Sequence, residues 1–126
     1  MGVVIPPISA EVAAQAAGHD VNYLAVSGVL DLMGEADRLP AIPGIQIADI
    51  AGGAMNAALG ILIALTARGK TGKGQYIDIS MTDGIVSMLA LQLYLHQRTG
   101  EFPERGDTQL SHRYACYNTY ETKDGR

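Results

Sequence analysis

The stretch that decides the fold runs from Ala48 to Lys70 and reads ADIAGGAMNAALGILIALTARGK. Ala, Leu and Ile dominate it through Leu65, and residues 68–70 add a cationic last turn and a glycine stop. The stretch predicts one long helix with Asp49 near its N-terminal turn. Its most apolar part, residues 50–65, is shorter than the ~20 residues that span a bilayer, which favours a buried helix of a soluble protein.

The residues before this helix predict shorter helical segments and a loop. Residues 9–17 are helix-prone. Over residues 20–33 the apolar side chains follow a mostly helical spacing that residues 27–28 interrupt, which predicts two short helices or one kinked helix. Residues 34–43 carry charged side chains and two prolines, a composition that predicts an exposed loop.

The patterns after the long helix predict a strand, a helix and a second strand. Residues 75–81 largely alternate apolar and polar side chains, as a half-buried strand does. Ser80 or Thr82 can cap a following helix that runs to about Arg98. Residues 114–122 are rich in aromatic and β-branched side chains, which favour a strand. We therefore expect a mostly helical chain with one or two strands, of the α/β class.

The composition limits the chain to one modest hydrophobic core. Its 126 residues are 48% hydrophobic, with 15 glycines and no Trp. Size scaling predicts that roughly 60–70% of the surface of the unfolded chain is buried if the chain folds alone. The interior should then be packed from Ala, Ile and Leu. A net charge of −4 without a basic run of residues excludes a nucleic-acid-binding module.

The single cysteine, Cys116, excludes an internal disulfide framework and a multi-cysteine zinc site. No basic or helix-start environment surrounds it in the sequence, so we expect a small core residue and not a nucleophile. The opening residues 1–7 lack the basic region of a signal peptide. These features predict a cytoplasmic protein with no metal site and no membrane contact.

Two proton-carrying side chains each stand where a helix is predicted to begin. His19 precedes the helical pattern that starts at residue 20, and Asp49 opens the long apolar stretch. A helix start offers free backbone N–H groups and the positive end of the helix dipole, which stabilise a carboxylate or a developing oxyanion. Each residue taken alone is also a reasonable capping residue. A catalytic role therefore requires the two helix starts to face one substrate.

Three motifs in this order resemble the family III CoA-transferases, the CaiB/BaiF family. They are AGHDVNYLAVSGVL at residues 17–30, IADIAGG at 47–53 and GILIALTARGKTGKGQYIDISMTDG at 60–84. The likeness covers residues 16–126 and is greatest to the racemase branch of the family, which acts on 2-methylacyl-CoA thioesters. Members are much longer than this chain, so the resemblance implies an internal fragment.

The resemblance implies a fold and a division into domains. Family members have a Rossmann-like large domain and form interlocked dimers. Residues 1–100 are then expected to be part of the large CoA-binding α/β domain, residues 101–113 a linker, and residues 114–126 the start of the small domain. The expected partners are an acyl-CoA substrate and a second copy of the chain.

The resemblance also implies roles for individual residues. Asp49 matches the catalytic carboxylate of the family, and His19 matches the partner base of the racemase branch. The residues expected to line the CoA thioester site are Gly18, Asp20, Asn22 and Tyr23. Glycines at 52 and 53 can bring the helix start close to a ligand, although tight helix packing explains them equally well. No separate cofactor is expected, because coenzyme A is part of the substrate.

The chemistry of these residues supports two reactions. Inversion of the α-carbon of a thioester needs one base to remove a proton from one face and a conjugate acid to return one to the other face, which His19 and Asp49 can supply. Donors at the helix start after Asp49 can stabilise the enolate oxygen between the two transfers. In the alternative, a CoA-transferase, Asp49 attacks the thioester and carries CoA as an aspartyl-CoA intermediate, which does not need His19. The presence of His19 favours the racemase.

A third hypothesis assigns no reaction to this part of the chain. In that case residues 1–126 are a helical packing segment that is catalytically empty without its neighbours. The long apolar helix would then need a partner surface to be buried.

Overall fold

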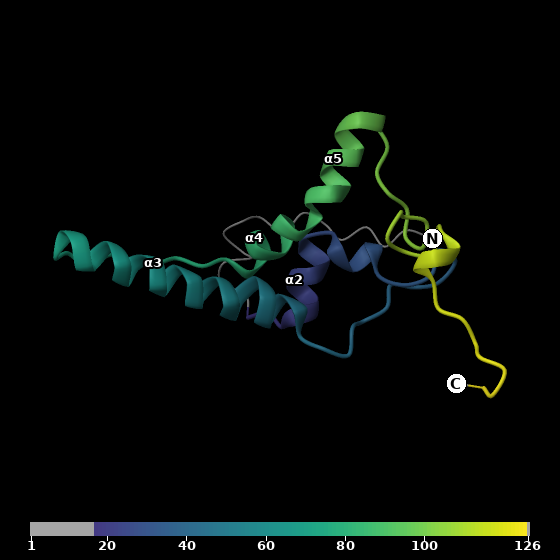
Figure 1. The fold of residues 1–126 in the computed structure, drawn as a ribbon, viewed down its shortest axis with the longest axis horizontal. Helices are drawn as coiled ribbons and strands as arrows, with labels where there is room; N and C mark the ends of the chain where they lie inside the picture. The colour runs from purple at the N-terminus through teal and green to yellow at the C-terminus, as the bar shows by residue number, and fades with distance from the viewer. Residues whose placement is uncertain (1–16, 126) are drawn as a thin grey trace.

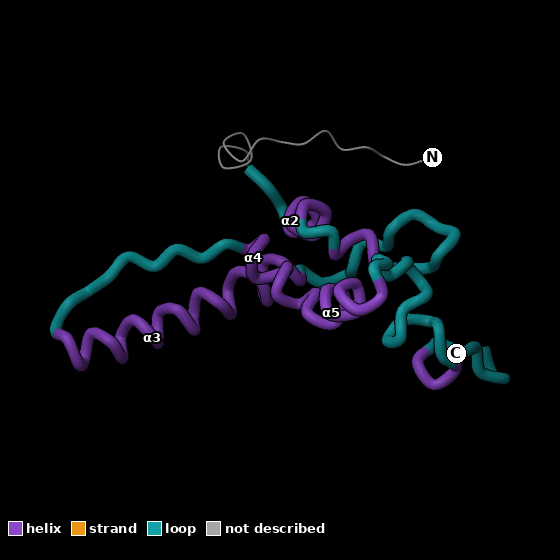
Figure 2. The backbone as a smooth tube through the Cα atoms, turned by 90° about the horizontal axis from the view of Figure 1, so that it is seen from above, coloured by secondary structure: helices purple, strands orange, loops and turns teal. Residues whose placement is uncertain are grey.

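The computed structural model describes residues 17–125, and all regular elements in this range are helices (Figures 1 and 2). Three of the helical turns are 3₁₀-helices, labelled η1, η3 and η4, and η2 is a π-helix. The elements in chain order are α2 (Asp20–Val26), η1 (Val29–Leu32), η2 (Ala48–Met55), α3 (Asn56–Thr71), α4 (Met81–Val86), η3 (Ser87–Leu89), α5 (Ala90–Thr99) and η4 (Ala115–Tyr117).

The predicted break in the first helical segment is confirmed. α2 ends at Val26, and η1 begins at Val29 after Gly28, whose φ of +80° lies in the left-handed region that favours glycine. Residues 34–43 form the predicted loop. Of the predicted helix over residues 9–17, only residue 17 lies among the described residues, and it is not helical.

The predicted long helix is confirmed, but its end differs. η2 and α3 follow each other without a gap from Ala48 to Thr71. The glycine stop is Gly72, with φ of +69° and an N–H that donates to Arg68 O at 2.8 Å. Gly69 lies inside the helix, so the predicted stop at this residue is wrong. Only a glycine that follows the last turn needs the left-handed conformation.

This helix is longer and more exposed than predicted. The stretch Ala48–Thr71 is long and apolar enough to cross a membrane by length and composition, and 6% of its apolar window is buried. The prediction of a buried helix is therefore wrong for the described chain, and that of a soluble helix stays a prediction. α3 projects from the other helices in both views (Figures 1 and 2). Large apolar side chains are exposed along it. They include Leu59, Ile61, Leu62, Ile63 and Leu65.

The predicted strand at residues 75–81 is not formed. This segment is extended and runs back along α3 (Figure 2). Ile77 and Ile79 are half-buried, and a Cβ on Gly60 of α3 would lie 3.1–3.2 Å from their side chains. The alternation of apolar and polar side chains is thus correct, but a strand also requires a hydrogen-bonded neighbour. No described segment pairs with it.

The helix predicted after this segment is confirmed in its bounds and is broken in its middle. Ser80 caps α4, because its Oγ accepts from the N–H of Asp83 at 3.1 Å. The 3₁₀-turn η3 separates α4 from α5, and α5 points in a new direction (Figure 1). α5 ends at Thr99, and Gly100, with φ of +77°, closes it.

The second predicted strand, over residues 114–122, is also absent. Residues 115–117 form the single turn η4, and the rest is irregular. As at residues 75–81, no described segment offers a ladder of backbone hydrogen bonds.

Near this segment, the side chain of Arg113 donates two hydrogen bonds to the carboxylate of Asp107, at 2.9 and 3.0 Å. These bonds lower the pKa of Asp107, so their stabilisation is present at neutral pH and is lost as pH falls through that lowered pKa.

The hydrophobic core lies where α2, η2 and α4 meet. Its fully buried side chains are Leu24, Ala48 and Ile85, one from each of these elements. This confirms the expected interior of Ala, Ile and Leu. Half-buried side chains pack around them, namely Tyr23, Val29, Leu30, Met33 and Ile47.

The core is smaller than the size of the chain predicts. The chain exposes 10049 Å² of surface. A compact protein of 13.3 kDa exposes about 6,500 Å² by the size scaling. The expectation of 60–70% burial is therefore not met, and much of the apolar surface is left to solvent.

Two glycines allow η2 and α4 to meet at the core. A Cβ on Gly84 would overlap Gly52 O and lie 2.5 Å from Asn56 Nδ2, and a Cβ on Gly52 would lie 2.7 Å from Met81 O. Asn56 Nδ2 in turn donates to Gly52 O at 2.9 Å. The two backbones are therefore as close as the absence of side chains permits.

A second connection joins the segment after α5 to the loop after η1. Arg105 Nε donates to Glu35 O at 3.1 Å, and Arg105 Nη1 donates to Asp31 Oδ1 at 3.1 Å. The side chain of Arg105 is 17% exposed. Beside it, a Cβ on Gly106 would lie 2.6 Å from Ala36 N. The segment predicted to be a linker is thus fastened to the helical part.

We expect Gly84→Ala to destabilise the protein by about 1–3 kcal/mol, because the methyl group forces η2 and α4 apart. Gly69→Ala is the matched control, since Gly69 is helical and nothing lies within 4 Å of its Cβ position. Alanine there should be neutral or stabilise by up to ~1 kcal/mol. Thermal unfolding followed by circular dichroism measures both variants. Equal Tm values would contradict the close approach.

We expect Arg105→Met to release residues 104–108, because hydrogen bonds to a charged group contribute roughly 1.5–3 kcal/mol. Backbone amides in this segment should exchange with heavy water faster, as measured by mass spectrometry. The control is Arg38→Met, since the side chain of Arg38 is 75% exposed in its pair with Glu35 and such pairs contribute little. Exchange that is unchanged in Arg105→Met would show that the connection does not hold the segment.

Candidate active site

His19 stands at the first of the two helix starts. It is the N-cap of α2, with extended backbone at φ −113°, and its side chain is exposed. The N–H of His19 donates to Asn22 Oδ1 at 2.9 Å, and its carbonyl accepts from Asn22 N–H at 2.8 Å. Asn22 therefore holds the backbone of His19, and the residue stays exposed.

Asp49 stands at the second helix start. It lies in the first turn of η2, and its side chain is exposed beside the buried Ala48. π-helical turns inside α-helices are rare and occur frequently at functional sites. This local geometry presents the carboxylate of Asp49 at the N-terminal end of a helix that continues to Thr71.

One hydrogen bond joins the two helix starts. The backbone N–H of Asp49 donates to Asp20 Oδ2 at 2.9 Å, across 29 positions of sequence. Leu24 of α2 and Ala48 of η2 lie together in the core behind this bond. The structure therefore brings the segments that carry His19 and Asp49 side by side, as a joint site requires.

The backbone donors at the second helix start are partly occupied. The N–H of Asp49 bonds to Asp20, and the N–H of Ile50 donates to Gln46 O at 3.3 Å. These two groups are thus not free to bind an oxyanion directly, and the role expected of donors after Asp49 stays a prediction for the residues beyond Ile50. What remains at this position is the positive end of the helix dipole.

The other residues predicted to line the site lie around these two. A Cβ on Gly18 would lie 2.9 Å from the ring of Tyr23, so the chain before His19 passes directly over this half-buried ring. Gly52 is buried against Met81 O, and a Cβ on Gly53 would lie 3.0 Å from Met81 Cγ. Both glycines therefore pack against α4, and their contact with CoA stays a prediction.

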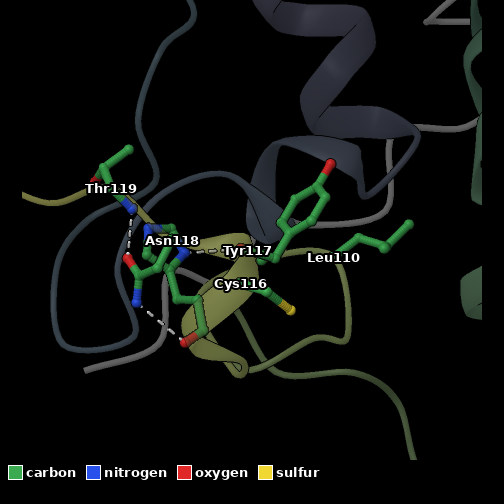
Figure 3. Close-up of a pocket in the computed structure, with 7 residues that line it drawn as sticks. Leu110, Cys116, Tyr117, Asn118 and Thr119 are labelled. Atoms are coloured by element: carbon green, nitrogen blue, oxygen red, sulfur yellow. Dashed lines mark hydrogen bonds between the residues drawn. The ribbon is translucent and has the colours of Figure 1, made fainter.

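Several hollows among the described residues lie apart from the predicted site residues, and one of them is formed by the C-terminal segment. No group of three or more His, Cys, Asp or Glu in residues 17–125 could hold a metal ion. The hollow, of about 370 Å³, is lined by residues 110–112 and 116–119 and contains none of the predicted site residues (Figure 3). Cys116 lies exposed at it, so the prediction of a core cysteine is wrong.

Sequence reasoning missed two contributions to the site. The acceptor role of Asp20 and the packing of Gly84 against Gly52 both join positions far apart in the chain. No local pattern signals the first. The motif at residues 60–84 includes Gly84 but does not indicate that this residue packs against Gly52.

Known proteins resemble this chain in sequence. The sequence model of CoA-transferase family III matches residues 10–126. The human protein named alpha-methylacyl-CoA racemase is 45% identical over 111 residues, which cover 86% of this chain and 28% of that protein. The succinyl-CoA:mesaconate CoA-transferase of Haloarcula hispanica is 34% identical over 106 residues, or 84% of this chain and 26% of that protein.

A solved structure is similar as well. The crystal structure of a CaiB/BaiF family protein from Brucella suis matches with a TM-score of 0.75 and 35% identity. The match covers 89% of this chain and 29% of that chain. The chain thus spans under a third of the length of these relatives.

Proposed function

The chain belongs to the family III CoA-transferases, and on this premise we propose that the complete protein inverts the α-carbon of a 2-methylacyl-CoA thioester by two-base proton transfer. The observation that carries the proposal is the hydrogen bond between the carboxylate of Asp20 and the N–H of Asp49. This bond holds the N-terminus of α2, which carries His19, beside the N-terminus of η2, which carries Asp49. The similarity to proteins named alpha-methylacyl-CoA racemase supports it.

In the proposed reaction one side chain removes a proton from the substrate and the other side chain returns one to the opposite face. Neutral His19 removes the α-proton from one face, and the electron pair of the C–H bond moves into the thioester carbonyl to give an enolate. Protonated Asp49 then returns a proton to the other face. In the reverse direction the carboxylate is the base and the imidazolium is the acid.

The enolate oxygen needs stabilisation between the two transfers. The helix from Ala48 to Thr71 directs its positive dipole end toward the region of Asp49. Since the N–H groups of Asp49 and Ile50 are already bonded, direct donors to the oxygen must come from other backbone or side-chain groups. A single such donor is worth about 3–4 kcal/mol in comparable sites.

The second candidate function is CoA transfer between carboxylic acids. It is supported by the relatives named as CoA-transferases, at 34–38% identity. Here the carboxylate of Asp49 attacks the acyl carbon and CoA thiolate leaves, which gives a mixed anhydride. The thiolate then attacks the carbonyl of Asp49 and releases the donor acid, and the acceptor acid takes CoA by the reverse steps. His19 has no role in this sequence.

The remaining expectations belong to the same proposal. They are coenzyme A as part of the substrate with no separate cofactor, an interlocked homodimer of the complete protein, and a cytoplasmic location without nucleic-acid or membrane partners. The similarity to family members over most of the chain supports an acyl-CoA substrate. A Rossmann-like large domain over residues 1–100 and a small domain from residue 114 complete the proposed organisation.

The test uses the complete protein, a single enantiomer of a 2-methylacyl-CoA and heavy water. We expect deuterium at the α-carbon together with loss of optical purity. Racemisation should fall roughly 100–10,000-fold in His19→Ala and in Asp49→Asn, the range that general acid–base groups contribute. His112→Ala is the matched control, because His112 is exposed in the C-terminal segment, and it should keep the full rate.

Other outcomes identify the other hypotheses. CoA transfer to a free acid without α-deuteration, together with hydroxylamine trapping at Asp49, would replace the racemase by the transferase. Equal rates in His19→Ala and in the unchanged protein would exclude the two-base mechanism. Comparison of the isolated 126-residue chain with the complete protein tests the packing-segment hypothesis, which equal activity would rule out.

A further inference from the structure

We propose that Asp20 is a positioning residue, whose carboxylate fixes the place of Asp49 relative to His19 by accepting the backbone N–H of Asp49. This inference rests on the proposed function. It assigns to Asp20 an action on the protein backbone that differs from the expected contact with the CoA thioester.

Asp20 is the residue that directly follows His19 and opens α2. Its side chain is half-buried, and Oδ2 lies 2.9 Å from the nitrogen of Asp49. A hydrogen bond to a charged acceptor is shorter and about twice as strong as a neutral one, and it is directional. The bond therefore specifies both the distance and the orientation between the two helix starts.

The other contacts between these starts are less specific. Leu24 and Ala48 meet in the core, and apolar contacts do not fix one orientation. The glycine contact between Gly52 and Gly84 holds η2 against α4, not against α2. Among the hydrogen bonds of the described residues, that of Asp20 is the one that links α2 to η2.

Loss of this bond should change the geometry of one base more than the other. The backbone of His19 is held separately by Asn22, through bonds of 2.9 and 2.8 Å. Asp49 has no second contact of this kind to α2. Since a displacement of 1 Å can cost about 100-fold in rate, proton transfer by Asp49 should suffer while transfer by His19 persists.

The test compares Asp20→Ala with Asp20→Asn in the complete protein. The amide oxygen of Asn can still accept the N–H of Asp49, whereas Ala cannot. We expect Asp20→Ala to lower kcat for racemisation roughly 10–100-fold with a KM within about threefold, and Asp20→Asn to restore the rate to within about fivefold. Asp37→Ala is the control for loss of an exposed loop carboxylate and should keep the full rate.

A stereochemical readout separates positioning from general destabilisation. The enantiomer whose α-hydrogen faces His19 is identified as the one whose exchange with heavy water is lost in His19→Ala. In Asp20→Ala this enantiomer should still exchange, with retention, at a rate within about threefold of the unchanged protein. The other enantiomer should lose exchange in parallel with racemisation, because it depends on Asp49.

Several results would overturn the inference while the proposed function stands. They are a full racemisation rate in Asp20→Ala, an equal loss of exchange for both enantiomers, or an Asp20→Asn variant as slow as Asp20→Ala. A raised KM with unchanged kcat would instead assign Asp20 to substrate binding. The proposed function itself fails separately, if the unchanged protein neither exchanges nor inverts the α-hydrogen.

Discussion

The arrangement of the candidate site depends on one close approach of two backbones, where Gly84 in α4 meets Gly52 in η2. The core behind it is small, and side chains at these positions would separate the elements that form it. Because Gly52 lies in the turn after Asp49, the same contact determines how far that carboxylate stands from α4. The contact that packs η2 against α4 therefore also determines the position of Asp49.

The second determinant is polar and lies at the edge of the core. The carboxylate of Asp20 and the N–H of Asp49 connect two segments that apolar contacts alone would leave free to shift. Asn22 holds the backbone of His19 in a similar way at the first helix start. The two helix starts are therefore arranged by hydrogen bonds to backbone groups, and His19 and Asp49 are both exposed.

Local patterns predicted the helical elements well, because capping, periodicity and glycine stops act within a few residues. The Ser80 cap and the break at Gly28 are examples. The strand predictions at 75–81 and 114–122 failed for a different reason, since alternation describes which side chains are buried and not whether a hydrogen-bonded neighbour exists. For the site, the motifs located His19 and Asp49, whereas the bond that joins their segments spans 29 positions and leaves no local signal. Family membership is shown over most of the chain, and the roles of these residues remain predictions.

The half-buried face of α3 has a consequence for sequence variation. The exposed Leu and Ile side chains leave one face of α3 to smaller residues, because Asn56, Ala57, Gly60, Ala64 and Ala67 are half-buried at helical spacing. The contacts on this face determine the angular setting of the helix: Gly52 and Asn56 meet α4 at one end, and Gly60 meets the extended chain along its length. Aliphatic residues elsewhere on the helix should therefore interchange freely among homologues, while these few small or polar positions tolerate almost no drift.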